Sequence, residues 1–209
     1  MCNTFALTLI VARIDMRPNY DLLYKIAENQ AGYFKAEQAR EVGFSWERLS
    51  SNVKNGKFLR VDQGIYRLVH FPGSPFEDLF VAWLRTGPKS TISHESALAV
   101  YELTDVLPGT IHVIVPRTAS RRRKGLRLHT NRLESQEITK RKGLPVTTAA
   151  RTIADVAAAG LAEEQIRQAI HEALRLGLTS KEELLVQAKN RGGRVAQIIQ
   201  STLNGDIDS

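Results

Sequence analysis

The sequence has little cysteine and no long apolar run, and each shortage excludes a class of protein. Its single cysteine, Cys2, allows no disulfide within the chain and no zinc site built from several cysteines. A reducing compartment, the cytoplasm, is therefore expected. The apolar run at residues 5–12 is far shorter than the roughly 20 residues of a membrane-spanning helix, and no basic segment precedes it as in a signal peptide. We therefore expect no membrane contact.

Motifs of catalysis are also lacking. The sequence contains no nucleophile elbow, no phosphate-binding glycine loop and no dinucleotide fingerprint. None of its five histidines has the spacing of a known metal-ligand pair. His94 is expected to cap or pack a helix, whereas His112 and His129 alternate with apolar residues and are expected to face outward. We predict a protein that is not an enzyme, with no catalytic residue, no metal and no cofactor.

Positive charge is abundant and unevenly placed. The formal net charge is +7, and residues 117–142 carry ten Lys or Arg against two Asp or Glu. Residues 17–72 carry nine basic and six acidic side chains. Such an excess favours an anionic partner, with nucleic acid first.

The N-terminal part has the order of elements of a winged helix-turn-helix. Spacing of apolar residues predicts helices over 20–30 and 34–42, and a third helix from the N-cap Ser45 to the stop signal Asn55-Gly56. Strands are expected over 58–61 and 65–69, with a hairpin turn between them. Three short helices followed by a hairpin are typical of this DNA-binding fold.

The Pro/Gly/Ser-rich residues 71–75 mark the expected boundary of a second part. There, helices are predicted to begin near residues 76, 93, 147, 163, 180 and 195, and strands to cover 110–116 and 126–133. We predict an α+β, mostly helical protein. Its expected segments are an N-terminal extension (1–18), a winged helix-turn-helix domain (19–72) and a domain of helices and a small sheet (73–209).

The third helix has side chains of the types that read DNA. Trp46, Leu49 and Val53 are expected to form its buried face. On the opposite face, Arg pairs with guanine and Asn with adenine, while Ser and Lys hold phosphates. The candidate DNA contacts of this helix and of the wing are Ser45, Arg48, Ser51, Asn52, Lys54, Asn55, Lys57, Arg60 and Arg67.

A second basic patch lies between the two strands expected over 110–116 and 126–133. Its residues are Arg117, Arg121, Arg122, Arg123, Lys124 and Arg127. This segment either clamps DNA phosphates or docks an acidic protein, and a simply solvated loop is the alternative.

Three segments resemble the AbiEi-family antitoxins of type IV toxin–antitoxin systems. They are the wing Leu59-Arg60-Val61-Asp62-Gln63-Gly64-Ile65-Tyr66-Arg67-Leu68, the helix Ser93-His94-Glu95-Ser96-Ala97-Leu98-Ala99, and the run from Gly143-Leu144-Pro145-Val146-Thr147 to Arg151-Thr152-Ile153-Ala154-Asp155. The likeness covers about residues 20–200. From the residues alone, Arg151 and Asp155 are expected to form an ion pair within a helix, because they are four positions apart.

The resemblance implies an autorepressor that neutralises a nucleotidyltransferase-type toxin. Because one winged helix has a small footprint, two copies are expected to bind double-stranded DNA at inverted repeats. Contact with the toxin stays open. A related group carries an endonuclease domain after the Gly192-Gly193 segment, and because this chain ends at Ser209 a remnant of that group is one alternative. A protein-binding adaptor is the other.

Overall fold

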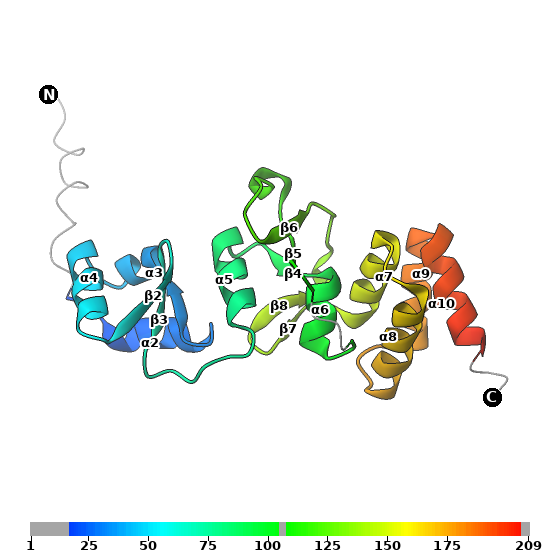
Figure 1. Cartoon of the computed structure of the whole chain (residues 1–209), viewed down its shortest axis with the longest axis horizontal. Helices are drawn as coiled ribbons and strands as arrows, with labels where there is room; N and C mark the ends of the chain where they lie inside the picture. The colour runs from blue at the N-terminus through cyan, green and yellow to red at the C-terminus, as the bar shows by residue number, and fades with distance from the viewer. Residues whose placement is uncertain (1–16, 105–107, 206–209) are drawn as a thin grey trace, which may run out of the picture. The chain divides into compact units, whose positions relative to one another are not determined.

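A computed structural model describes residues 17–104 and 108–205, and the chain divides into an N-terminal unit, 1–75, and a C-terminal unit, 76–209. Most of the expected N-terminal extension (1–18) lies outside the described residues. The α+β, mostly helical fold class is confirmed (Figure 1). Among the described residues, no helix is both long and apolar enough to cross a membrane.

The N-terminal unit packs three helices against a three-stranded sheet. Its elements are α2 (Tyr20–Glu28), β1 (Tyr33–Lys35), α3 (Ala36–Glu41), α4 (Trp46–Lys54), β2 (Phe58–Asp62) and β3 (Ile65–Leu68). The strands lie antiparallel in the order β1-β3-β2. Leu23, Phe34, Phe44 and Leu49 are among the side chains that form the core. Burial of these aromatic and aliphatic groups stabilises the short helices, which would be only marginally stable in isolation.

Strand β1 differs from the sequence prediction, which placed residues 34–42 in one helix. Residues 33–35 are instead extended and pair with β3, Phe34 opposite Tyr66. Their rings stack with centroids 5.7 Å apart. A three-residue strand has no period that a sequence can show, and only its partner β3 stabilises it.

The C-terminal unit contains a five-stranded mixed sheet in the order β6-β5-β4-β8-β7. The strands are β4 (Thr91–Ile92), β5 (Ile111–Ile114), β6 (Leu126–His129), β7 (Ile138–Arg141) and β8 (Leu144–Thr147). The sequence prediction contained β5 and β6 but not the other three. Strand β4 has two residues, and Pro145 in β8 is a residue that normally argues against a strand inside a sheet.

The described part of this unit also contains six α-helices: α5 (Glu77–Thr86), α6 (His94–Tyr101), α7 (Ala149–Ala159), α8 (Glu163–Arg175), α9 (Lys181–Arg191) and α10 (Gly193–Gly205). Helix α7 contacts α6, α8, α9 and α10 (Figure 1). Every residue from Ala149 to Ala157 is buried. The many alanines allow this close approach on all sides, since larger side chains would not fit between the helices.

Candidate nucleic-acid interface

Helix α4 is the third helix of the N-terminal unit and carries most of the candidate DNA contacts. The hydroxyl of Ser45 caps it by accepting a hydrogen bond from the backbone N–H of Arg48 at 3.2 Å. Leu49 is fully buried and anchors the helix to the domain core. The side chains of Arg48, Ser51, Lys54 and Asn55 are exposed. Within residues 17–104 and 108–205, no salt bridge engages Arg48 or Lys54, so both cations are available to an anionic partner.

Glu47 lies in the first turn of α4 and places a negative charge on the exposed side. Hydrogen bonds from its own backbone N–H and from the Ser45 hydroxyl lower the pKa of this carboxyl, so it stays ionised at neutral pH. A carboxylate at a helix N-terminus also interacts favourably with the helix dipole. The carboxylate of Glu47 thus stabilises the N-terminus of α4.

Asn52 is not on the exposed face, and this corrects the expectation that it reads a base. Its side chain is only 4% exposed. The amide donates to the backbone carbonyl of Arg48 at 2.8 Å and accepts from the hydroxyl of Tyr20 at 3.1 Å. Asn52 therefore fixes α4 to α2, and its hydrogen-bonding groups are turned away from any DNA.

Trp46 was expected on the buried face of the same helix, and the structure corrects this. Its side chain is 52% exposed, and the guanidinium of Arg40 lies over its ring, 5.3 Å from the centroid. The buried face is rotated toward Leu49 and Asn52, because α4 packs against β2 and is joined to α2 by the hydrogen bond between Tyr20 and Asn52. A helical wheel gives the spacing of a face but not the side from which its neighbours approach.

The wing places two of its three predicted cations on the surface. Lys57 and Arg60 are exposed, and the ammonium of Lys57 lies 5.5 Å from the ring centroid of Tyr20. Arg67 is half-buried instead. Its guanidinium donates to the carbonyl of Phe71 at 2.8 Å and lies over the ring of Tyr33. Arg67 is thus engaged within its own unit, and the prediction of a DNA contact at this residue is not supported by its position.

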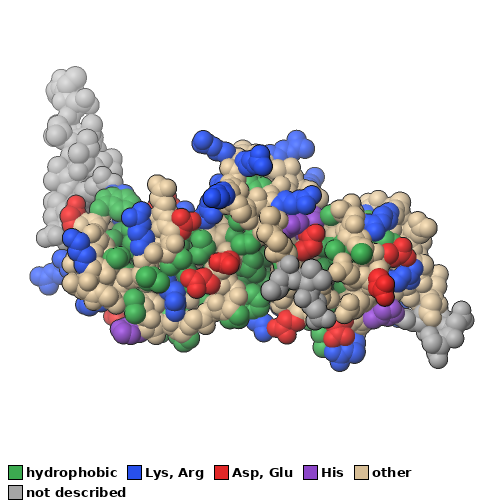
Figure 2. All heavy atoms as spheres, viewed as in Figure 1, with side chains coloured by type: hydrophobic (Ala, Val, Ile, Leu, Met, Phe, Trp, Pro, Cys, Tyr) green, Lys and Arg blue, Asp and Glu red, His purple; other side chains and the backbone are tan. Residues whose placement is uncertain are grey.

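The second basic patch begins in a one-turn helix after β5, Arg117–Ala119, and ends in β6. Figure 2 shows Lys and Arg side chains gathered on this part of the C-terminal unit. Arg123 is partly buried and donates to the carbonyl of Ala119 at 3.0 Å, which shapes the loop. The exposed members of the patch are Arg117, Arg121, Arg122, Lys124 and Arg127.

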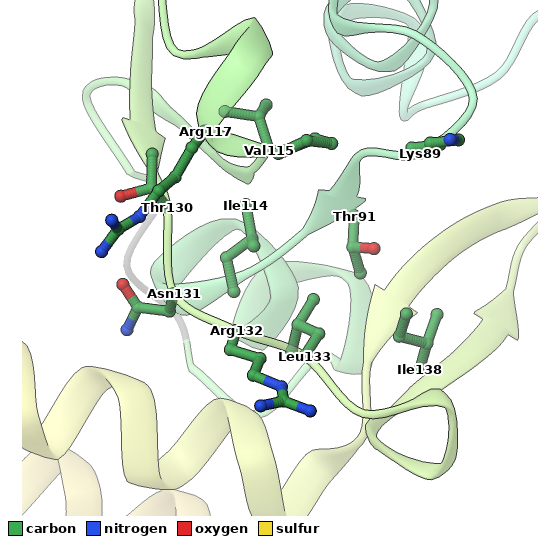
Figure 3. A pocket seen from close by; sticks show the side chains of 11 residues that line it. Lys89, Thr91, Ile114, Val115, Arg117, Thr130, Asn131, Arg132, Leu133 and Ile138 are labelled. Atoms are coloured by element: carbon green, nitrogen blue, oxygen red, sulfur yellow. The ribbon is translucent and has the colours of Figure 1, made fainter.

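A pocket of about 370 Å³ adjoins this patch (Figure 3). Lys89, Arg117 and Arg132 bring three cationic side chains to its lining, together with the apolar Ile114 and Ile138. Arg132 is paired with Glu134 at 2.9 Å, which satisfies part of its charge. The pocket therefore extends the basic surface of the C-terminal unit.

Arg151 and Asp155 lie in the third segment that resembles the antitoxin family, and they form part of a buried ion network. The predicted ion pair within α7 is present, with Arg151 Nε 3.0 Å from Asp155 Oδ2. Arg151 also contacts Glu137 at 2.6 Å, and Arg191 of α9 contacts the other oxygen of Asp155. Burial acts against ionisation of Glu137, but hydrogen bonds from Glu134, Arg151 and Gln187 hold its pKa below the usual value. These contacts join α7, α9 and the one-turn helix Ser135–Glu137 that precedes β7, so the run has a structural role.

The histidines differ most from the sequence prediction. His112 and His129 were expected to face outward, but His112 is 4% exposed and His129 is partly buried. Both lie beside His94, which is 3% exposed. The donor atoms of the three rings all lie within 4.8 Å of one another, so these residues are able to hold a metal ion. Residues 17 and 18 positions apart give no motif that a sequence search can recognise.

Comparison with known proteins supports the assignment of the N-terminal unit. Residues 21–69 match the family model described as "Transcriptional regulator, AbiEi antitoxin". A search of curated proteins finds no match.

A solved structure extends the likeness in fold to most of the chain. The RV2827C protein from Mycobacterium tuberculosis has a similar fold with a TM-score of 0.55 and 12% sequence identity, over 91% of this chain and 79% of the other. This identity carries information on fold alone. The matched segment runs from α2 to β3, through all three helices and both wing strands. Over residues 21–69, the N-terminal unit is therefore similar to the AbiEi antitoxin family of transcriptional regulators.

Proposed function

We propose that this chain represses its own operon by binding its operator DNA, and that it acts as the antitoxin of a type IV pair whose toxin is a nucleotidyltransferase. The observation that carries the DNA-binding part is the exposed polar face of α4, inside the segment that matches a family of transcriptional regulators. No catalytic step is part of the proposed role.

The exposed residues have separate tasks in the proposed complex. Arg48 pairs with O6 and N7 of a guanine, and Asn55 with an adenine, in the major groove. Ser51 and Lys54 hold phosphates and so fix the register of the helix on the duplex. Lys57 and Arg60 contact the backbone from the wing. The proposed set is Ser45, Arg48, Ser51, Lys54, Asn55, Lys57 and Arg60.

A single winged helix covers a short stretch of DNA, because one module buries only about 600–1,000 Å² of protein surface. We therefore propose that two copies bind an inverted repeat, each placing α4 in one half-site. Dimerisation on the DNA accounts for specificity that one small footprint does not supply.

A gel-shift titration with the DNA upstream of the gene tests the autorepressor role. The expected result is a complex that resists scrambled competitor DNA at two salt concentrations. Equal binding to both sequences, lost at the higher salt, contradicts sequence-specific regulation and favours general charge attraction. No binding to either DNA, with binding to an acidic protein, supports the adaptor alternative.

The antitoxin role needs its own experiment. The product of the adjacent gene is expressed alone and together with this chain, and growth is measured. Growth arrest that this chain relieves supports the proposal. Arrest that persists at equal toxin levels contradicts the antitoxin role and leaves DNA binding untouched. Co-purification of the two proteins distinguishes direct contact from indirect neutralisation.

The basic patch is expected to add phosphate contacts. Replacing Arg121, Arg122 and Lys124 together by Gln should reduce the slope of log affinity against log salt by up to about 2.7, since each lost phosphate contact removes about 0.9. Affinities for operator DNA at several salt concentrations measure this slope.

A matched control removes the same charge elsewhere. Arg175, Lys181 and Lys189 are exposed residues of α8 and α9, and their joint replacement by Gln also lowers the net charge by three. If both triple variants change the slope equally, total charge explains the effect and the patch has no specific contact with DNA.

A further inference from the structure

Three histidines converge at one point of the C-terminal unit, although each comes from a different element. His94 begins α6, His112 lies in β5 and His129 ends β6. Strands β5 and β6 are parallel, with His112 opposite Arg127 and Ile114 opposite His129. This register places His112 and His129 on the same face of the sheet, because side chains alternate along a strand. Helix α6 packs against β5 and brings His94 to them.

Backbone and side-chain hydrogen bonds hold the three residues in place. The N–H of Ser93 donates to the carbonyl of His112 at 3.1 Å, and the N–H of Val115 donates to the carbonyl of His129 at 2.8 Å. The hydroxyl of Ser96 accepts from the N–H of His112 at 2.9 Å. The cluster is therefore built into the junction of α6 with the sheet.

One ring nitrogen of the cluster has two close polar neighbours, and a single proton does not satisfy both. Nδ1 of His112 lies 2.7 Å from Oε2 of Glu95 and 3.4 Å from Nε2 of His129. This nitrogen carries either a proton or a lone pair, so it cannot pair well with both neighbours. Oε2 of Glu95 is buried, and Nδ1 of His112 is its neighbour at 2.7 Å. A carboxylate oxygen and imidazole nitrogens gathered in this way are all of the kinds of atom that bind zinc.

His94 has a backbone φ of 51°, in the left-handed region that is unfavourable for a residue with a side chain. Such strain is concentrated at functional sites.

We propose that His94, His112, His129 and Glu95 bind a divalent transition-metal ion of the zinc class. The 3.4 Å between the facing nitrogens of His112 and His129 matches the spacing of about 3.3–3.5 Å between two ligands that each lie about 2.0–2.1 Å from a tetrahedral zinc. Three nitrogens and one oxygen suit zinc, cobalt or nickel, whereas magnesium and calcium prefer oxygen alone.

The ion would have a structural role, since four protein ligands leave no open position for a substrate. It would join α6 to β5 and β6, the two strands on either side of the basic segment 117–124. The rings of His94 and His129 stack at 3.6 Å with an interplanar angle of 12°, so one ring must turn to direct both donors at a shared ion. Binding is therefore expected to break this stack.

Metal binding by the full chain tests the proposal and is independent of DNA binding. Chelator-treated protein is titrated with Co²⁺ and Zn²⁺ while visible absorption and thermal unfolding are recorded. The expected result is one ion per chain, the visible absorption bands of tetrahedral cobalt, and a higher unfolding temperature with the ion. Binding of less than one ion per chain, or cobalt spectra of the free aqueous ion, would overturn the proposal.

Substitutions assign the ligands. His94→Ala, His112→Ala and His129→Ala are each expected to lower zinc affinity at least about 100-fold, and Glu95→Gln at least about tenfold. His70→Ala is the control, because His70 is an exposed histidine of the other unit. Equal affinity in the control and in the cluster variants places the ion elsewhere and overturns the assignment.

A second measurement covers the case in which the buried variants fail to fold. Crystals of the unaltered chain grown with Zn²⁺ locate the ion through its anomalous scattering. A peak between the three imidazoles supports the site. A peak elsewhere, or none, overturns it.

Discussion

Replacing Asp155 by Ala is expected to lower the free energy of unfolding of the C-terminal unit by about 3–5 kcal/mol. Asp155 is 1% exposed and its carboxylate contacts the guanidinium groups of both Arg151 and Arg191. Arg151 is itself only 4% exposed. Removal of the carboxylate leaves a buried cation short of its counter-charge, and the cost comes from that unpaired charge rather than from the lost volume.

Urea unfolding followed by tryptophan fluorescence measures this change. The chain has two tryptophans, Trp46 in the N-terminal unit and Trp83 in the other. In a Trp46→Phe background the signal of Trp83 reports on the C-terminal unit alone. Glu163→Ala is the control, because Glu163 forms an exposed pair with Arg167 and such pairs contribute about 0–1 kcal/mol. A loss below about 1 kcal/mol for Asp155→Ala would show that the network does not stabilise the unit.

Arg48→Ala is expected to weaken specific operator binding by about 1–3 kcal/mol and to leave the unfolding free energy of the N-terminal unit nearly unchanged. Its side chain is exposed on α4, so the domain loses no packing. Asn52→Ala should do the reverse. It removes hydrogen bonds to Tyr20 and to the Arg48 carbonyl, at a cost of about 1–3 kcal/mol of stability, with a smaller effect on DNA affinity of the folded protein.

Gel shifts and denaturation of the same preparations separate these two effects. Arg175→Ala is a control for the loss of one exposed arginine outside the N-terminal unit. Operator affinity that is unchanged by Arg48→Ala, at equal stability, would remove α4 from the proposed interface. A larger affinity loss for Asn52→Ala than for Arg48→Ala would mean that Asn52 turns outward on DNA.

The sequence was sufficient to predict most local structure in the N-terminal unit. Helix α4 begins after the N-cap Ser45 and ends at the stop signal Asn55-Gly56, as expected, and the hairpin forms at residues 58–68. These signals are local, because a capping hydroxyl or a glycine acts within one turn of chain. For the same reason, the i, i+4 pair of Arg151 and Asp155 could be predicted, whereas its partners Glu137 and Arg191 could not.

Packing between distant segments decides which side of each element is covered. Local signals were enough to predict the fold class, the helix with the candidate DNA contacts and the basic segment at 117–127. Packing then buried Asn52, exposed Trp46 and brought His94, His112 and His129 together from three elements. The physical reason is that periodicity and caps depend on neighbours along the chain, while burial and side-chain clusters depend on strand pairing and helix packing between distant segments.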